Sequence, residues 1–136
     1  MGKLGDGYVC AGSFRPLTDV SVPGIKFCND LQDKYRNGKR VTHIMYEAGI
    51  LEGMIQVEAL RLAMLKVPFK KLTRKTVLEQ GFYQIKNLDT GEISSTPLTY
   101  GKGDIEGVDK IRIDQVQNGK VVPVGLTPLR HIYTRK

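Results

Sequence analysis

The chain has 136 residues, of which 40% are hydrophobic and 26% are charged, and its formal net charge is +7. This length suits one domain with a sizeable core, and the composition, which has no low-complexity tract, is ordinary for a soluble globular protein. Fifteen glycines and six prolines indicate frequent turns between short elements and argue against a plain helix bundle.

The positive charge is spread over the whole sequence. Residues 1–68 carry nine basic and seven acidic side chains, and residues 69–136 carry twelve and seven. The densest basic cluster consists of five residues that precede Glu79: Lys66, Lys70, Lys71, Arg74 and Lys75. Phe69 is the one aromatic residue among them, so we interpret the cluster as a solvated loop and expect no nucleic-acid partner. A basic nucleic-acid-binding module stays the alternative.

The cysteines and the N-terminus give little functional information. Cys10 and Cys28 form no CxxC pair, and with His43 and His131 as the two histidines they give no zinc spacing. A disulfide between the two cysteines and a pair of buried thiols both remain open. The N-terminal sequence MGKLGDGYV lacks the continuous apolar stretch of a signal peptide, so we expect no export address in this chain.

The first predicted elements are a strand and a helix. Gly7–Ser13 reads as a short buried strand that ends near Gly12. Val22–Asn37 has apolar residues at helical spacing, with Pro23 in the first turn, where its missing N–H costs nothing. Asn37 followed by glycine predicts the end of this helix.

The most apolar run, His43–Leu65, is long enough to suggest a membrane span. Four charged residues interrupt it, each costly at a bilayer centre: Glu47, Glu52, Glu58 and Arg61. Six further residues share one helical face: Tyr46, Ile50, Gly53, Val57, Leu60 and Met64. A second apolar stripe consists of Leu51, Ile55 and Leu62. We expect a core helix, capped by Thr42, whose first stripe is packed in the interior.

The last third of the chain predicts a short helix and then strands. Thr73 caps a helix that runs to Glu79 and ends at Gly81. The segments Phe82–Ile85 and Glu92–Ser95, on either side of a turn at residues 89–91, predict a hairpin or a pair of short segments.

A second hairpin is predicted more strongly. Its turn is Asn118 and Gly119, between the apolar runs 111–116 and 121–124, because Asn-Gly is the strongest short-range hairpin signal. Pro123 predicts that the second arm lies at a sheet edge. Together the elements predict an α/β fold.

No known catalytic motif is present in the sequence. The glycine-rich segment 101–107 lacks phosphate-loop spacing, and Glu47 and Glu52 diverge by about 140° on a helix, too far for a catalytic pair. His43 has the chemistry of a general base, but no nucleophile can be assigned to it. These observations favour a binding protein over an enzyme, without a cofactor or metal.

Four segments occur in a familiar order: GDGYVCAGSF, IKFCNDLQDKY, HIMYEAGILEGMIQVEALRLAM and IRIDQVQNGKVVPV. This order resembles the C-terminal part of a type I periplasmic solute-binding protein, in the branched-chain amino acid and amide receptor group that serves ABC importers. Pro23, Phe27 and Tyr35 stand near corresponding family positions, as do Tyr46, which opens the long helix, and the closing segment 118–124.

The resemblance implies a partial clamshell fold, with helices packed on a small mixed sheet and a C-terminal β-hairpin. Residues 1–136 would form one α/β unit, the last third or so of a two-lobe protein that is periplasmic or otherwise extracytoplasmic. It would bind an amino acid or amide and deliver it to an ABC permease. Ser13, Phe14, His43 and Tyr46 would lie nearest the ligand cleft. Tyr46 also belongs to the predicted buried stripe, so a purely structural role fits it equally well.

A ligand-sensing domain of a signalling receptor shares this fold and stays a second alternative. Because most of the two-lobe protein has no counterpart here, we expect the chain alone to bind such ligands weakly or not at all. Unpaired strand edges and uncovered helix faces predict a homo-oligomer. The transport interpretation depends on the stripe from Tyr46 to Met64 being packed inside the receptor lobe.

Overall fold

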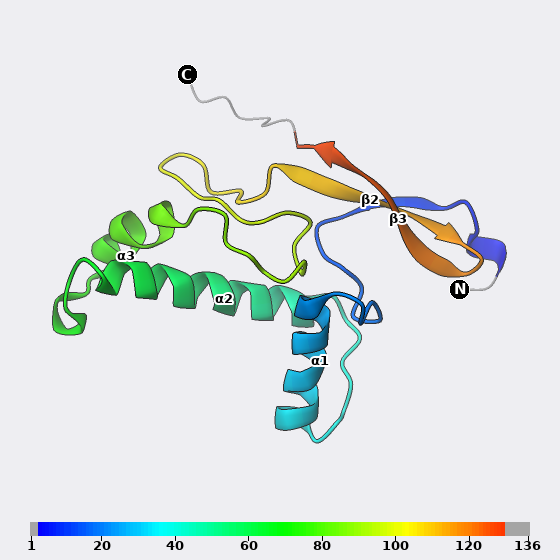
Figure 1. Ribbon diagram of the computed structural model, residues 1–136, viewed down its shortest axis with the longest axis horizontal. Coiled ribbons are helices and arrows are strands. Elements are labelled where there is room, and N and C mark those ends of the chain that lie inside the picture. The colour runs from blue at the N-terminus through cyan, green and yellow to red at the C-terminus, as the bar shows by residue number, and fades with distance from the viewer. Residues whose placement is uncertain (1–2, 130–136) are drawn as a thin grey trace.

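The computed structural model describes residues 3–129 (Figure 1). Its helices and strands are β1 (Val9–Gly12), α1 (Pro23–Arg36), α2 (Met45–Met64), α3 (Arg74–Gln80), β2 (Lys110–Gln117) and β3 (Lys120–Pro128). The long segment between α3 and β2 runs back along α2, the sheet lies beyond it, and α1 projects away from the start of α2 (Figure 1). The α/β class and the C-terminal hairpin are therefore confirmed.

The sheet has the strand order β1-β2-β3, and both pairings are antiparallel. The expectation of a mixed sheet is wrong for the described residues. β3 follows β2 through a two-residue turn, in which Asn118 and Gly119 have φ angles of 52° and 73°, as a tight hairpin turn requires. β1 pairs with the other edge of β2 in the same antiparallel sense, from Val9 opposite Gln115 to Gly12 opposite Arg112.

β3 is an edge strand, as Pro123 predicts. Its outer edge has no ladder partner among the described strands, so the missing N–H of Pro123 costs no ladder bond. The register shifts between Ile113 and Asp114, which pair with Gly125 and Pro123. This leaves Val124 as the extra residue of a β-bulge.

The start and stop signals predicted from the sequence are correct for α1 and α3 and wrong for α2. α1 begins at Pro23, and the residue after its last, Asn37, is left-handed with a φ of 52°. Thr73 caps α3 by accepting a hydrogen bond from the N–H of Thr76 at 3.1 Å. The prediction that Thr42 caps α2 is wrong. A turn from the His43 carbonyl to the N–H of Tyr46 already curves the chain before the helix, and the ring Nδ1 of His43 accepts from the N–H of Met45 at 3.2 Å.

The hairpin predicted within residues 82–95 is also wrong. Phe82–Gln84 forms a 3-10 turn, and the nearest approach to a ladder is an isolated bridge between Leu88 and Leu98. The intervening Gly91 carbonyl accepts a hydrogen bond of 2.7 Å from the N–H of Gly24. The turn therefore holds the start of α1 and does not close a hairpin.

The core lies between α2 and the segment that runs back along it. This segment contributes four buried residues, Ile85, Ile93, Leu98 and Tyr100, and α2 contributes Leu51 and Ala59. Cys28 of α1 and Leu17 of the β1–α1 loop complete the cluster. The core thus joins α1, α2 and the β1–α1 loop to the segment that follows α3, and the sheet lies at one side of it.

The apolar stripe expected in the interior is largely exposed. Val57, Leu60 and Met64 have exposed fractions of 66%, 42% and 49%, and Gly53 is exposed as well. Tyr46 packs partly against the core. The prediction is wrong because α2 has two apolar sides, and the described chain covers the second stripe instead.

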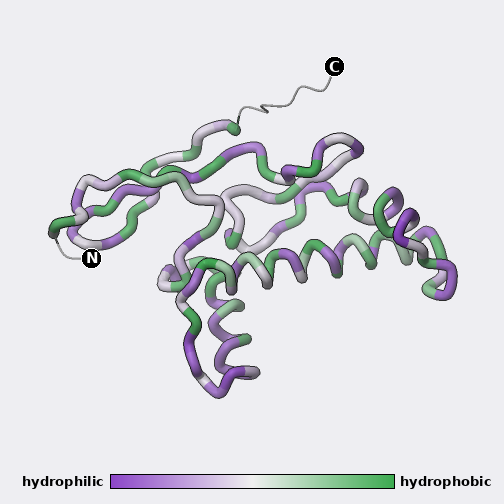
Figure 2. Tube along the Cα trace, turned by 180° about the vertical axis from the view of Figure 1, so that it is seen from behind, coloured by the Kyte–Doolittle hydropathy of each residue, from purple (hydrophilic) through white to green (hydrophobic). Residues whose placement is uncertain are grey.

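Leu51 of that second stripe is buried, and Ile55 and Leu62 pack partly against the core. Hydrophobic and hydrophilic residues accordingly alternate along the whole of α2 (Figure 2). Within residues 3–129, no helix combines the length and the apolar character that a membrane crossing needs. The transport interpretation cannot rest on the first stripe and needs other support.

Candidate functional site

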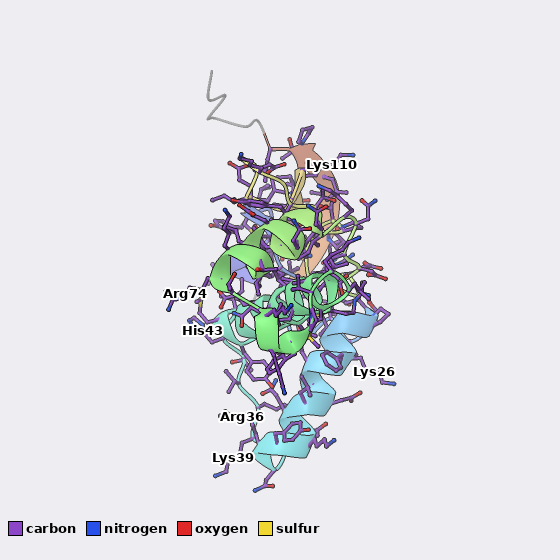
Figure 3. All side chains as sticks on the ribbon, turned by 90° about the vertical axis from the view of Figure 1, so that its left-hand side faces the viewer. Lys26, Arg36, Lys39, His43, Arg74 and Lys110 are labelled. Carbon is purple, nitrogen blue, oxygen red and sulfur yellow. The ribbon has the colours of Figure 1, made fainter. Side chains whose placement is uncertain are left out.

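The four predicted ligand residues lie at the end of β1 and the start of α2. The carbonyl of Ser13 accepts a hydrogen bond from the N–H of Ser95 at 3.1 Å, and Phe14 forms an isolated bridge with Ser94. Phe14 and Tyr46 pack against the same core cluster, whereas His43 is exposed (Figure 3). The structure therefore brings Phe14 and Tyr46 to one cluster, and the ligand contacts of all four residues stay predictions.

A buried ion pair fixes the loop beside these residues. On β2, Arg112 Nε and Asp114 Oδ1 are 2.6 Å apart, and each side chain is 5% exposed. The two residues are two apart in the strand and therefore point to the same face of the sheet. Arg112 Nη2 also donates to the Phe14 carbonyl at 2.5 Å. This contact ties the β1–α1 loop to β2, and Arg112 Nη1 has no hydrogen-bond partner among the described residues.

Glu47 is a buried carboxyl in the first turn of α2, 2% exposed. Burial raises its pKa to about 7, although the backbone N–H of Leu17 and the charge of Arg112 both act to lower it. Its Oε2 is buried without a hydrogen-bond partner in the described part of the chain. A carboxyl in this environment changes charge near neutral pH, which makes the contact between α2 and the β1–α1 loop sensitive to protons.

Both cysteines are free thiols. Cys28 is fully buried, and its burial, together with the nearby charge of Glu47, raises its pKa to about 11. A thiol with a raised pKa is a poor nucleophile. Cys28 therefore serves the core. Cys10 is only half-buried, so the expectation of buried thiols is correct for Cys28 alone.

A polar cleft of about 700 Å³ opens between the β1–α1 loop and the C-terminal hairpin. Its polar lining consists of Arg15, Thr18, Asp19, Ser21, Arg112, Asp114 and Lys120. Arg15 is held at the rim by Asp19 at 3.2 Å and by Glu92 at 2.7 Å. Four of these charged residues are already paired within the protein, Arg15 with Asp19 and Arg112 with Asp114. Sequence reasoning missed this cleft because its residues come from segments about 100 positions apart.

A second, apolar groove of about 740 Å³ lies between α2 and α3. Its lining includes Ile55, Ala59, Leu60, Val77, Phe82 and Tyr100. Its polar and charged lining residues are Glu52, Gln56, Thr73 and Arg74. Within residues 3–129, no group of three or more His, Cys, Asp or Glu side chains is arranged to hold a metal ion, and His131 lies outside the described residues.

Comparison with known proteins gives one informative match. No protein-family model matches the sequence, and no curated protein matches it either. The fold is similar to the crystal structure of a branched chain amino acid ABC transporter from Thermus thermophilus with bound valine, with a TM-score of 0.68 and 25% sequence identity. The match covers 96% of this chain and 35% of that chain, so this chain spans about a third of the length of the protein it resembles.

This match confirms the resemblance inferred from the order of the sequence segments. The fold class is that of part of a solute-binding protein, and the similarity is to a transport protein and not to an enzyme. The agreement extends over nearly the whole chain, which the loose individual motifs could not establish. It replaces the exposed stripe of α2 as the support for the transport interpretation.

Proposed function

We propose that this chain is part of an extracytoplasmic solute-binding receptor that delivers amino acids, amides or similar small ligands to an ABC importer. The observation that carries the proposal is the fold similarity over 96% of the chain to a branched chain amino acid ABC transporter with bound valine. Residues 1–136 would be one α/β unit, the C-terminal portion of a two-lobe receptor. Its partner in the membrane would be the permease of that importer.

The mechanism we propose is hinge closure. A ligand that contacts both lobes at once stabilises the closed state, so binding shifts the balance between open and closed receptors. This chain would contribute Ser13, Phe14, His43 and Tyr46. Two hydrogen bonds support a fixed geometry for the first pair: Ser95 N–H to the Ser13 carbonyl and Arg112 to the Phe14 carbonyl. A preorganised loop loses little conformational entropy when a ligand binds.

An amide NMR titration of the chain tests the ligand class. With millimolar valine or a small amide we expect weak, saturable shifts at Ser13, Phe14 and Tyr46, and none with glucose as the control. Shifts confined to Arg15 and Lys120 would move the site to the polar cleft. If no amino acid or amide perturbs any residue, the proposed ligand class is wrong.

The affinity of the chain alone is a separate expectation. Because it supplies one side of the proposed cleft, calorimetry should detect no binding of leucine or valine in the micromolar range. Micromolar binding by a monomer would show that the described residues form a complete site. The proposal of two-lobe closure would then fail, although the ligand class would survive.

We also propose that copies of the chain associate with one another. The support is the open side of α2, where Val57, Leu60 and Met64 are between 42% and 66% exposed. Exposed apolar side chains that adjoin one another on one helix face favour association in water. Light scattering that finds a stable monomer at high concentration would contradict this expectation.

A further inference from the structure

The turn between α2 and α3 combines exposed cations with exposed apolar side chains. We call residues Met64–Lys75 the basic tip. Its five basic residues are all exposed: Lys66, Lys70, Lys71, Arg74 and Lys75. Between them, Leu65 and Phe69 have exposed fractions of 68% and 72%. In Figure 2 this end of the molecule is coloured both purple and green, which marks hydrophilic and hydrophobic residues side by side.

The backbone of the basic tip is held by hydrogen bonds. The N–H of Leu65 bonds to carbonyls of the last turn of α2. Phe69–Lys71 form a 3-10 turn in which the N–H of Leu72 bonds to the Phe69 carbonyl at 3.0 Å. Thr73 then caps α3. Phe69 is therefore presented to solvent by an ordered turn and not by a loose loop.

None of the five cations forms an ion pair with a described residue. The basic tip also lies at the end of α2 that is remote from the sheet (Figure 1). In the view onto this end, Arg74 is well separated from Lys26 and Lys39 of the α1 region (Figure 3). No described carboxylate is paired with these five charges, although Glu79 lies nearby on α3, and the cluster sits at a projecting end of the molecule.

We propose that the basic tip docks this protein onto the surface of an anionic lipid bilayer. Lysine and arginine side chains would contact lipid phosphates, and Leu65 and Phe69 would enter the headgroup region. Peripheral proteins bind membranes through this pairing of basic and apolar side chains. Each basic residue near an anionic surface contributes about a fivefold gain in affinity. The proposal does not depend on which ligand the receptor binds.

A bilayer explains the composition of the basic tip better than a nucleic acid does. Single-stranded nucleic acids stack their bases on aromatic side chains, and Phe69 is the one aromatic residue in the basic tip. Leu65 and Met64 are exposed aliphatic side chains that gain nothing from a phosphate backbone. Their transfer from water to the acyl boundary of a bilayer is favourable.

Vesicle sedimentation of the full chain tests the proposal. We expect binding to vesicles of equal parts phosphatidylglycerol and phosphatidylcholine, little binding to pure phosphatidylcholine, and a decline as salt rises. The double variant Lys70→Gln/Lys71→Gln should lose about 25-fold in affinity, because two charges are removed. Phe69→Ser should also weaken binding, with the net charge unchanged. Circular dichroism checks that each variant is folded.

The matched control is Lys26→Gln/Lys39→Gln, which removes the same charge from exposed positions away from the basic tip. This variant should bind anionic vesicles almost as tightly as the unmodified chain. An equal loss in the two double variants would overturn the proposal in favour of attraction by net charge. Absence of vesicle binding would also overturn it, and salt-dependent DNA retention in that case would identify a nucleic acid as the anionic partner.

Discussion

The two sides of α2 are similar in sequence and opposite in surroundings. On the covered side, Leu51 is 8% exposed and Ala63 is fully buried, whereas on the open side Val57 is 66% exposed. Both sides carry apolar residues at helical spacing, so the periodicity identifies the helix but not the side that the chain covers. What decides which side is covered is the segment after α3, which runs back along α2 and forms the core with Leu51 and Ala59. Helical spacing therefore indicates that a helix has an apolar side, and the tertiary structure determines which apolar side is covered.

The largest expected effect is a difference in stability between alanine substitutions on the two sides of α2. Leu51→Ala should lower the free energy of unfolding by about 2–5 kcal/mol, because it leaves a cavity in the core. Leu60→Ala, the same change on the half-exposed side, should cost less than about 1 kcal/mol. Urea unfolding followed by circular dichroism measures both. Equal losses would mean that the open side is covered in solution.

A second prediction concerns the buried carboxyl on the covered side. Glu47 has a pKa of about 7 in the folded protein, above its ordinary value of 4.5. The folded state therefore holds a proton that the unfolded state has released, and the stability that this group contributes below pH 4.5 is lost as pH rises through 7. The loss amounts to about 3 kcal/mol.

The measurement is the free energy of unfolding across this pH range in the unmodified chain and in Glu47→Gln. We expect the unmodified chain to lose stability relative to Glu47→Gln as pH rises. Glu52→Gln, on an exposed position of the same helix, is the matched control and should retain the slope of the unmodified chain. Parallel curves for the chain and Glu47→Gln would show that Glu47 keeps its charge in the folded state.

A third prediction uses two glycines. An added Cβ at Gly81 would lie 2.1 Å from the Ala59 carbonyl oxygen of α2, whereas at Gly53 nothing lies within 4 Å. Gly81→Ala should therefore destabilise by about 1–3 kcal/mol through overpacking. Gly53→Ala should stabilise by about 0.5–1 kcal/mol, because alanine favours the helix. Thermal unfolding distinguishes these outcomes by the opposite signs of the shift in Tm.

Local signals predicted those elements whose causes are local. Pro23 and Asn37 mark the ends of α1, Thr73 caps α3, and the turn at Asn118 forms as expected. The segment 82–109 could not be predicted in this way. Its conformation depends on partners elsewhere, such as the bond between Gly91 and Gly24, and no local pattern encodes such a contact.

The candidate site was less predictable than the fold. The resemblance indicated Phe14 and Tyr46, which do pack against one core cluster. It did not indicate Glu47 as a buried carboxyl or the pair of Arg112 and Asp114. For Arg112 and Asp114, the sequence signal was the alternation of charged with apolar residues along β2. Alternation predicts which residues share a face, but not that the charged face is the buried one.

The smallest expected effect on stability concerns the open side of α2 and its role in self-association. Val57→Ser should change the free energy of unfolding by no more than about 0.5 kcal/mol, since the side chain is mostly in water. It should nevertheless lower the associated fraction in sedimentation velocity, because it removes apolar surface from the contact. Val20→Ser is the matched control: Val20 is 64% exposed but lies in the β1–α1 loop. If both variants associate like the unmodified chain, the open side of α2 is not the contact, and its apolar residues must be explained by a partner other than a second copy.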